Sequence, residues 1–197
     1  SYMATYDVAD RSAIVTGAGA GIGREVALLL ARNGAHVVAQ DINADAAAAV
    51  VSEIEAAGGR ASAVVGDAGD EAVISEYIRA AQALGPFGIA INNAGIGGGL
   101  APTGQYTDAD WDRTVSLNLT TVFRGVRAQV NAMTETGGSI VNAKTASRSL
   151  VNASGCSVIS ATGGPTAVVP VGPVGPVHTA WPVSRSPAAR GNGSRCG

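Results

Sequence analysis

Short apolar segments alternate with longer segments of helical periodicity through the first 143 residues, and this alternation limits the folds open to the chain. Strands are predicted at 13–16, 36–40, 61–65, 89–91 and 139–142. Helices are predicted at 22–33, 44–57, 71–84 and 108–133. Because a helix between two strands allows a right-handed crossover, the strands should be parallel and the helices should cover both faces of the sheet. The predicted fold class is therefore α/β, a doubly wound parallel sheet in a three-layer α/β/α arrangement.

The composition changes near residue 144. All 15 acidic residues precede this point, whereas six of the eight prolines follow it. The prolines at 165, 170, 173 and 176 would break a helix, at about 3 kcal/mol for each interior position, and they do not suit central parallel strands. We expect an atypical Pro-, Gly- and Val-rich segment over 146–197, in the same domain if it is ordered. One hypothesis is that the residues after about 143 misrepresent the parent polypeptide, because a shifted reading frame in a GC-rich gene would give this composition.

Charge, hydropathy and cysteine usage argue against several classes of partner. The formal net charge of −2 gives no electrostatic argument for a nucleic acid or an anionic membrane surface. The longest aliphatic run, at 26–31, is far shorter than a membrane span, and residues 1–10 lack the basic and apolar regions of a secretory signal. Two cysteines are too few for a disulfide framework or a thiolate metal cluster. These features predict a cytoplasmic protein with no nucleic-acid partner, no membrane partner and no metal site.

The turn after the first predicted strand is rich in glycine, with the sequence Thr-Gly-Ala-Gly-Ala-Gly-Ile-Gly over 16–23. Positions without side chains let the backbone turn tightly and come close to a pyrophosphate, which the N–H groups at the start of the next helix can bind. The turn therefore predicts a dinucleotide site. The residues expected near the phosphates are Gly17, Gly19, Gly21, Ile22 and Gly23. The alternative is that the glycines serve only to pack the strand tightly against the helix.

Asp41 ends the second predicted strand, 24 residues after Gly17, where an acid can accept hydrogen bonds from the adenosine ribose. A carboxylate there disfavours the 2′-phosphate of NADP, because two like unit charges about 4 Å apart repel by roughly 4 kcal/mol at an effective dielectric of 20. The segment from Gly17 to Gly23 contains no Arg or Lys that would offset this repulsion. The sequence therefore favours NAD as the cofactor. Alternatively, Asp41 could cap the helix that follows.

Four motifs in order resemble those of the short-chain dehydrogenase/reductase family, over about residues 8–143. They are the Thr-Gly-x-x-x-Gly-x-Gly turn at 16–23, Asp67 after the third strand, Asn-Asn-Ala-Gly at 92–95 after the fourth, and Asn118 in the long helix. The resemblance implies a Rossmann-like fold, in which Asp67 hydrogen-bonds the adenine and the segment 92–95 supports the sheet and passes under the cofactor. The residues thus assigned to the cofactor are Gly17, Gly19, Gly21, Ile22, Gly23, Asp41, Ile42, Asp67, Ala68, Asn93, Ala94 and Gly95.

Asn118 lies on an apolar stripe of the long predicted helix. The stripe comprises Trp111, Val115, Val122, Phe123, Val126, Val130 and Met133. A buried amide needs hydrogen-bond partners, so Asn118 is either a satisfied core residue or a functional one. In the family the matching asparagine holds a water in the proton relay, and the resemblance implies that role here. The stripe is wide enough to pack against a partner, and the family's usual dimer interface uses this helix, which implies a homo-oligomer, either a dimer or a tetramer.

The catalytic motif of the family is incomplete in this sequence. The family uses a tyrosine whose pKa is lowered by a lysine four residues on, and a serine that steadies the substrate oxygen. Thr145 matches the serine position, but Val158 and Thr162 occupy the positions expected for the tyrosine and the lysine. A loop two residues shorter would place Cys156 and Ser160 there, although an incidental thiol is the simpler interpretation of Cys156.

Three functions remain open from the sequence. The first is an NAD-dependent oxidoreductase that transfers hydride between nicotinamide and a small-molecule alcohol or carbonyl substrate. In this hypothesis residues 1–145 form the dinucleotide-binding domain, Asn118 and Thr145 are the visible catalytic residues, and the substrate lies near the glycine-rich segment 95–99, which could equally be a plain loop. The second is a truncated or degenerate protein that binds the dinucleotide without catalysis, because the tyrosine and the lysine are missing. The third is an NADP-dependent enzyme, despite Asp41.

Overall fold

The computed structural model describes residues 8–99 and 101–143, together with the backbone of three short strands beyond them. The main sheet contains β1 (Ser12–Thr16), β2 (His36–Asp41), β3 (Ala61–Val65), β4 (Phe87–Asn92), β5 (Gly138–Asn142) and β8 (Val168–Val171). The α-helices are α1 (Gly21–Arg32), α2 (Ala44–Ala56), α3 (Glu71–Leu84), α4 (Asp108–Val115) and α5 (Thr121–Ala132). A 3-10 turn, η1 (Thr103–Gln105), precedes α4, and a π-helical segment, η2 (Ser116–Thr120), joins α4 to α5. Two further short strands, β6 (Asn152–Ala153) and β7 (Cys156–Ser157), pair with each other.

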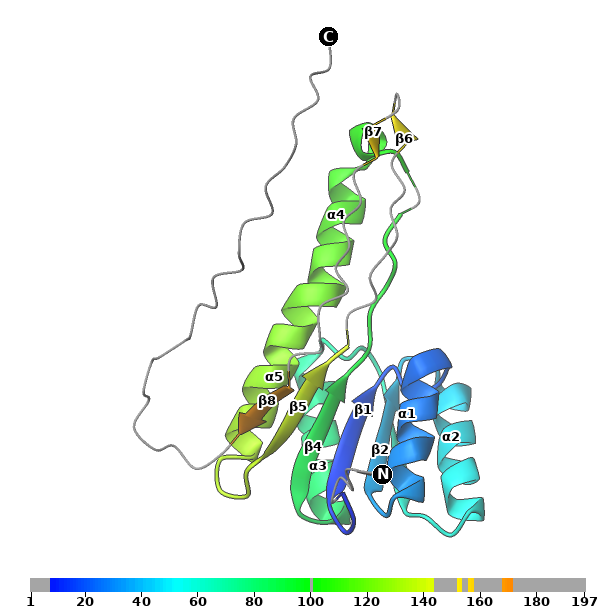
Figure 1. The fold of residues 1–197 in the computed structure, drawn as a ribbon, viewed down its shortest axis with the longest axis vertical. Coiled ribbons are helices and arrows are strands. Elements are labelled where there is room, and N and C mark those ends of the chain that lie inside the picture. The colour runs from blue at the N-terminus through cyan, green and yellow to red at the C-terminus, as the bar shows by residue number, and fades with distance from the viewer. Residues whose placement is uncertain (1–7, 100, 144–151, 154–155, 158–167, 172–197) are drawn as a thin grey trace, which may run out of the picture.

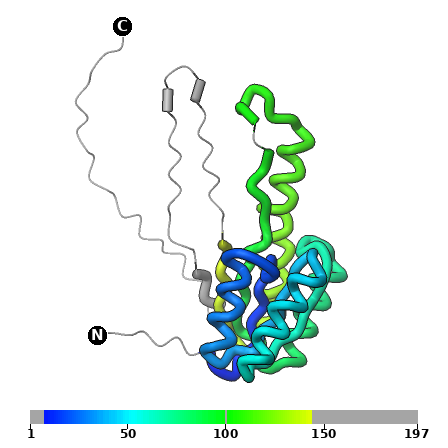
Figure 2. Tube along the Cα trace, turned by 90° about the vertical axis from the view of Figure 1, so that its right-hand side faces the viewer, coloured from blue at the N-terminus to red at the C-terminus, as the bar shows by residue number. Residues whose placement is uncertain are grey.

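The sheet has the strand order β3-β2-β1-β4-β5-β8, and its first five strands are parallel (Figure 1). Helices α1 and α2 pack against one face of the sheet, and α3 and α5 pack against the other (Figures 1 and 2). The predicted three-layer α/β/α fold is thereby confirmed. Because the parallel strands all end at the same edge, the loops that follow them are brought together there.

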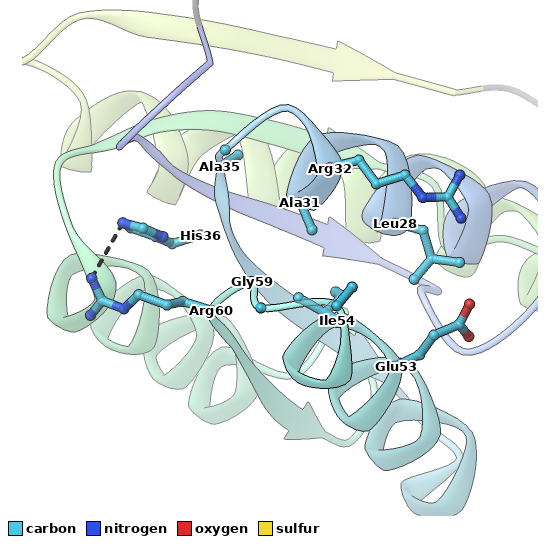
Figure 3. A pocket seen from close by; sticks show the side chains of 12 residues that line it. Leu28, Ala31, Arg32, Ala35, His36, Glu53, Ile54, Gly59 and Arg60 are labelled. Atoms are coloured by element: carbon cyan, nitrogen blue, oxygen red, sulfur yellow. Dashed lines mark hydrogen bonds between the residues drawn. The ribbon is translucent and has the colours of Figure 1, made fainter.

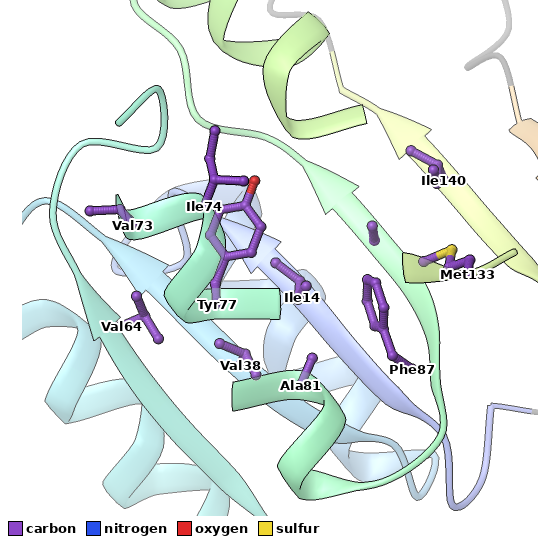
Figure 4. Packing of buried hydrophobic residues seen from close by; sticks show 11 residues of the cluster. Ile14, Val38, Val64, Val73, Ile74, Tyr77, Ala81, Phe87, Met133 and Ile140 are labelled. Carbon is purple, nitrogen blue, oxygen red and sulfur yellow. The ribbon is translucent and has the colours of Figure 1, made fainter. Parts of the chain in front are cut away.

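Apolar side chains fill the space between the sheet and each helical layer. On the α3 side, Ile14 and Val38 of the strands meet Ile74 and Tyr77 of α3, and Met133 closes the cluster beyond α5 (Figure 4). The cluster on the other side contains Val15, Val37, Ala39, Leu28, Val50 and Ile54. Alternate residues of each strand thus enter opposite cores, as expected for a sheet that is buried on both faces.

Polar residues define where three of the helices begin. The side chains of Asn43, Asp70 and Thr107 accept hydrogen bonds from backbone N–H groups in the first turns of α2, α3 and α4. Because Asn43 caps α2, the alternative in which Asp41 is the cap is wrong. Among the described residues, no helix has both the length and the apolar composition needed to cross a membrane.

The long helix predicted over 108–133 is present as three consecutive helical elements, but it is not α-helical throughout, because η2 has π-type hydrogen bonding. One extra residue in a turn rotates the residues that follow by about 100°, so the predicted apolar stripe does not stay on one face. Trp111 is 61% exposed and Phe123 60%, whereas Met133 is fully buried. The buried face of α5 is instead formed by Thr121, Gly125 and Gln129, at intervals of four residues.

Strand β8 runs antiparallel to β5 at the edge of the sheet, with Pro170 opposite Ser139. An edge strand tolerates a proline because its missing N–H group need not join a ladder on the outer side. A helix through 165–176 would have supported the hypothesis of misassigned residues. The described part of this segment is a strand, so the fold lends that hypothesis no support.

A buried polar network joins the sheet to α5. The side-chain amides of Asn92 and Gln129 donate to each other, at 2.9 and 2.8 Å, and the amide of Asn92 also donates to Asn142 Oδ1 at 2.9 Å. The Tyr77 side chain hydrogen-bonds Gln129. A Cβ at Gly125 would lie only 3.2 Å from the Tyr77 hydroxyl, so glycine lets α5 come close to this network. The ends of β4 and β5 are therefore fixed to each other and to the helical layer.

Burial raises the pKa of Tyr77 from 10.0 to about 12, against a smaller lowering by its hydrogen bond to Gln129. Between about pH 10 and pH 12 the unfolded chain loses this proton while the folded chain keeps it. The free energy of unfolding should therefore fall by up to about 1.4 kcal/mol per pH unit in this range. Urea denaturation at several pH values should show this slope in the wild type and a shallower one in Tyr77→Phe. Equal slopes in the two proteins would contradict this origin.

Candidate functional site

Most of the residues that the sequence assigns to a site lie at the carboxyl edge of the sheet. The chain leaves β1 through the turn 17–20, β2 through 42–43, β3 through 66–70 and β4 through 93–99. These four strands are neighbours in the sheet. Since the chain proceeds from β1 in one direction to β2 and β3, and β4 lies on the other side, the strand order reverses between β1 and β4. In open α/β sheets this reversal is where ligands bind.

The glycine turn after β1 combines one crowded position with one open position. A Cβ at Gly23 would overlap the carbonyl oxygen of Gly17 and lie 2.5 Å from Nδ2 of Asn93, so only glycine allows α1 to begin this close to the strand end. At Gly21, which has a φ of +53°, a Cβ would meet no atom within 4 Å. Tight packing of strand and helix therefore accounts for Gly23 but not for Gly21, where the turn faces open space.

The N-terminus of α1 lacks the cap that the other loop-initiated helices have. Ala20 occupies the N-cap position, makes no side-chain hydrogen bond, and is followed by a first turn without acidic residues. By contrast, α2, α3 and α4 each have a side-chain cap and at least one acid in the first turn. An uncapped first turn presents backbone N–H groups and a partial positive charge to the space before the helix, and both features suit an anion.

Asp41 lies directly beside this turn. Its Oδ2 accepts a hydrogen bond from the Gly19 N–H at 2.8 Å, and its Oδ1 accepts one from the Asn43 N–H at 2.9 Å. The carboxylate is therefore held in place by two backbone donors. Each of its oxygens can accept a further hydrogen bond, for example from a hydroxyl group. The neighbouring Ile42 is 75% exposed and adds apolar surface at the same strand end.

The loop after β4 is fastened to the end of β1. The hydroxyl oxygen of Thr16 accepts hydrogen bonds from the N–H groups of Asn93 and Ala94, at 3.0 and 3.1 Å. The side-chain amide of Asn93 donates to the carbonyl oxygens of Thr16 and Gly17, each at 3.2 Å. The glycine turn and the segment 93–95 therefore form one connected surface. Thr16 was not among the site residues that the sequence singled out, although its place at the strand end, just before the first glycine, could have identified it.

Asp67 and Ala68 lie in the next loop along the edge. The Asp67 side chain is exposed, and its Oδ1 accepts a hydrogen bond from the Gly69 N–H at 2.8 Å. Ala68 is 8% exposed. Asp67 follows β3 by two residues, so it stands beside the end of β2, where Asp41 lies. Among the described hydrogen bonds, Asp67 makes none to the glycine turn.

Asn118 lies in η2, and its side chain hydrogen-bonds the loop after β4. Its Oδ1 accepts from the Ile96 N–H at 2.9 Å, and its Nδ2 donates to the Ile96 carbonyl at 2.8 Å. The side-chain amide is therefore satisfied by one backbone residue, as in the interpretation of Asn118 as a satisfied asparagine. A Cβ at Gly95 would lie 2.7 Å from Asn118 Oδ1, so glycine is needed for this approach. Thr145 and the positions 158 and 162 lie outside the described residues, as does the side chain of Cys156.

A cavity of about 450 Å³ lies elsewhere, between the C-terminal ends of α1 and α2. Leu28 and Ile54 form part of its wall, and Arg60 Nη1 lies 3.3 Å from His36 Nε2 at its rim (Figure 3). Since His36 begins β2, the cavity is at the amino edge of the sheet, opposite the glycine turn. It is therefore separate from the site that the sequence predicts.

Comparisons with known proteins agree with this arrangement. Residues 11–162 match the family model described as short chain dehydrogenase. The chain is 39% identical over 135 residues to a cyclohexanol dehydrogenase from Acinetobacter sp. (strain SE19), a match that covers 68% of this chain and 54% of that protein. It is 42% identical over 132 residues to the 7alpha-hydroxysteroid dehydrogenase of Escherichia coli (strain K12), over 66% of this chain and 51% of that protein.

A solved structure shows the same similarity in three dimensions. The 7 alpha-hydroxysteroid dehydrogenase complexed with NADH and 7-oxo glycochenodeoxycholic acid matches with a TM-score of 0.65 and 40% identity, over 70% of this chain and 54% of that chain. The chain spans about half the length of the curated relatives that it matches. Since the family model covers most of the chain and its motifs occupy the loops at one edge of a Rossmann-like sheet, the chain belongs to the short-chain dehydrogenase family.

Proposed function

We propose that this chain binds NAD and serves as the cofactor-binding part of an oxidoreductase that transfers hydride between nicotinamide and an alcohol or carbonyl substrate. The observation that carries the proposal is the uncapped N-terminus of α1, which opens onto a glycine turn held by the Asp41 carboxylate. A helix terminus of this kind suits a pyrophosphate, and a carboxylate beside it suits ribose hydroxyls.

The residues present fit a dinucleotide. The space beside Gly21 is open, and no acid in the first turn of α1 would repel a phosphate. In this proposal the pyrophosphate lies against the first turn of α1, and the adenosine ribose donates hydrogen bonds to Asp41. Asp67 and Ala68 bind the adenine, and the segment 93–95 supports the rest of the cofactor. When bound, NAD supplies the hydride acceptor.

The substrate class is proposed from the relatives. Their names specify cyclohexanol and a 7alpha-hydroxysteroid, both of which carry a secondary alcohol on a ring. We therefore propose a cyclic secondary alcohol, or the matching ketone, as the substrate. It would approach the cofactor beside the glycine-rich segment 95–99, and Thr145 would contribute a hydroxyl to its oxygen.

A second candidate function is dinucleotide binding without turnover. Tyr106 is the last tyrosine of the sequence and Lys144 is its only lysine, so neither residue of the family's catalytic pair is found at positions 158 and 162. Hydride transfer at a carbonyl needs a proton donor at the oxygen. A chain without that donor would retain the cofactor site described above but would not turn over the substrate.

Catalysis is tested by measuring binding and turnover on one sample. We expect NADH to bind and to be consumed with at least one cyclic ketone from a panel that includes cyclohexanone and a 7-oxo steroid. Calorimetry measures the binding, and NADH absorbance follows the turnover. If NADH binds but no ketone of the panel causes its oxidation, the second candidate is favoured. Absence of NADH binding would contradict both candidates.

The choice of cofactor is tested at Asp41. Charge repulsion predicts that the wild type binds NADH more tightly than NADPH by up to about a thousandfold. Asp41→Asn removes the charge but keeps an oxygen acceptor, so it should narrow this ratio at least about tenfold. Asp45→Asn makes the same change at an exposed position in the first turn of α2 and should leave the ratio unchanged. Tighter NADPH binding by the wild type would instead support the NADP-dependent alternative.

We also propose that the chain forms a homo-oligomer through α4, η2 and α5, and that it is cytoplasmic, as its sequence predicts. The support for the oligomer is the exposure of three large apolar side chains along these elements: Trp111, Leu119 and Phe123 are 61%, 58% and 60% exposed. The molar mass from light scattering after size-exclusion chromatography should be at least that of a dimer. The substitution Phe123→Glu should lower this mass toward that of the monomer. A monomeric wild type would contradict this proposal.

A further inference from the structure

The glycine-rich segment after β4 is held at one end by Asn118 of η2 and at the other by Tyr106, which follows η1 and precedes α4. Asn118 grips Ile96 at the beginning of the segment, through both halves of its amide. At the other end, the Gly99 N–H donates to the Tyr106 hydroxyl at 3.0 Å. The segment 96–99 is therefore a short bridge. It runs from the end of β4, where the backbone of Asn93 and Ala94 donates to Thr16, to Tyr106, which precedes the N-terminus of α4.

The hydroxyl of Tyr106 belongs to a chain of hydrogen bonds with a defined direction. The Thr114 hydroxyl lies 3.1 Å from the Tyr106 hydroxyl and donates its single proton to the Asp110 carbonyl at 2.7 Å. Tyr106 must therefore be the donor to Thr114, and its oxygen is left to accept from Gly99. The order is Gly99 N–H to Tyr106 O–H, Tyr106 to Thr114, and Thr114 to the first turn of α4. Each hydroxyl both donates and accepts, so the chain is fully satisfied.

Two glycines of the bridge are fitted to this contact. Gly98 has a φ of +76°, and a Cβ there would lie 2.7 Å from the Tyr106 hydroxyl. A Cβ at Gly99 would lie 3.4 Å from the Tyr106 ring. The sequence left open whether these glycines form a plain loop. The close approach of the Tyr106 side chain gives them a specific partner, because a side chain at Gly98 would displace the hydroxyl.

We propose that Tyr106 is a positioning residue that latches the segment 96–99 against α4 and thereby fixes one wall of the substrate pocket. This inference rests on the proposed function, because it takes the space beside the segment as the place where the substrate meets the cofactor. The wall consists mainly of glycine backbone, so its position depends on these fastenings more than on side-chain packing. A bulky cyclic substrate can approach such a wall closely, because glycine backbone has no side chains in its way. Tyr106 acts through the wall and does not itself touch the reacting atoms.

The test is Tyr106→Phe, which keeps the ring and removes only the hydroxyl. Amide hydrogen exchange at Gly99 should become at least about tenfold faster, because that N–H loses its acceptor. The KM for the best ketone of the panel should rise about tenfold while kcat changes less than about twofold. The dissociation constant for NADH should stay within about twofold, because the pyrophosphate and ribose contacts are proposed at the ends of β1 and β2, and Asn93 and Ala94 are held by Thr16 and not by Tyr106. A change confined to NADH affinity, or unchanged exchange at Gly99, would overturn the proposal.

A pair of threonine variants supplies the matched control. Thr114→Val and Thr134→Val each remove a hydroxyl that donates to the carbonyl four residues earlier, at 2.7 and 3.1 Å. Only Thr114 also holds Tyr106, so only Thr114→Val should reproduce the faster exchange at Gly99. Equal effects of the two variants would overturn the latch. The exchange experiment needs neither turnover nor NADH. A chain that binds no NADH would therefore refute the proposed function, while hydrogen exchange at Gly99 would still test whether Tyr106 holds the segment 96–99.

Discussion

The contact between the Thr16 hydroxyl and the backbone of Asn93 and Ala94 is the constraint on which the site depends. It joins two segments that are 77 and 78 residues apart in the sequence but follow neighbouring strands. Because Asn93 also donates to the carbonyls of Thr16 and Gly17, the glycine turn cannot move independently of the loop after β4. The start of α1 follows the glycine turn directly, and the Asp41 carboxylate accepts a hydrogen bond from Gly19 in the same turn, so both lie next to this junction.

The buried side-chain amides of Asn92 and Gln129 fix the end of β5 to the end of β4. Asn92 hydrogen-bonds Asn142 through its side chain, and its carbonyl oxygen accepts from the Ala143 N–H at 3.0 Å. Gln129 completes the hydrogen bonding of Asn92 from the helical layer. A buried amide that lost its hydrogen-bond partner would lower the free energy of unfolding by about 1–3 kcal/mol. Replacing any one of these side chains should therefore destabilise the fold. The chain therefore leaves β5 from a fixed point beside the proposed cofactor site.

The sequence was sufficient to predict the architecture, and it places the proposed site residues at strand ends, but it does not show how these residues are held. The five parallel strands and the first three helices follow from periodicity, whereas the antiparallel edge strand β8 was not predicted. The glycine turn and Asp41 are recognised from their places at strand ends. The π-helical segment could not be found this way, because Ser116–Thr120 has nothing in its composition that distinguishes it from an α-helix. Gln129 and Thr121 were missed because a search for apolar periodicity passes over polar residues that are satisfied inside the core. Tyr106 was missed because its partner, Gly99, has no side chain to signal a contact.

The first helix has a consequence for how long such a protein persists in a cell. A terminus that lacks both a capping side chain and an acid is completed best when an anion occupies it. Any ligand that binds only the folded form adds RT ln(1 + [L]/Kd) to the free energy of unfolding, which is about 2.7 kcal/mol at a hundredfold excess over Kd. Under the proposed function, resistance to proteolysis would rise and fall with the concentration of the dinucleotide, so the size of the cell's dinucleotide pool would influence the abundance of this protein.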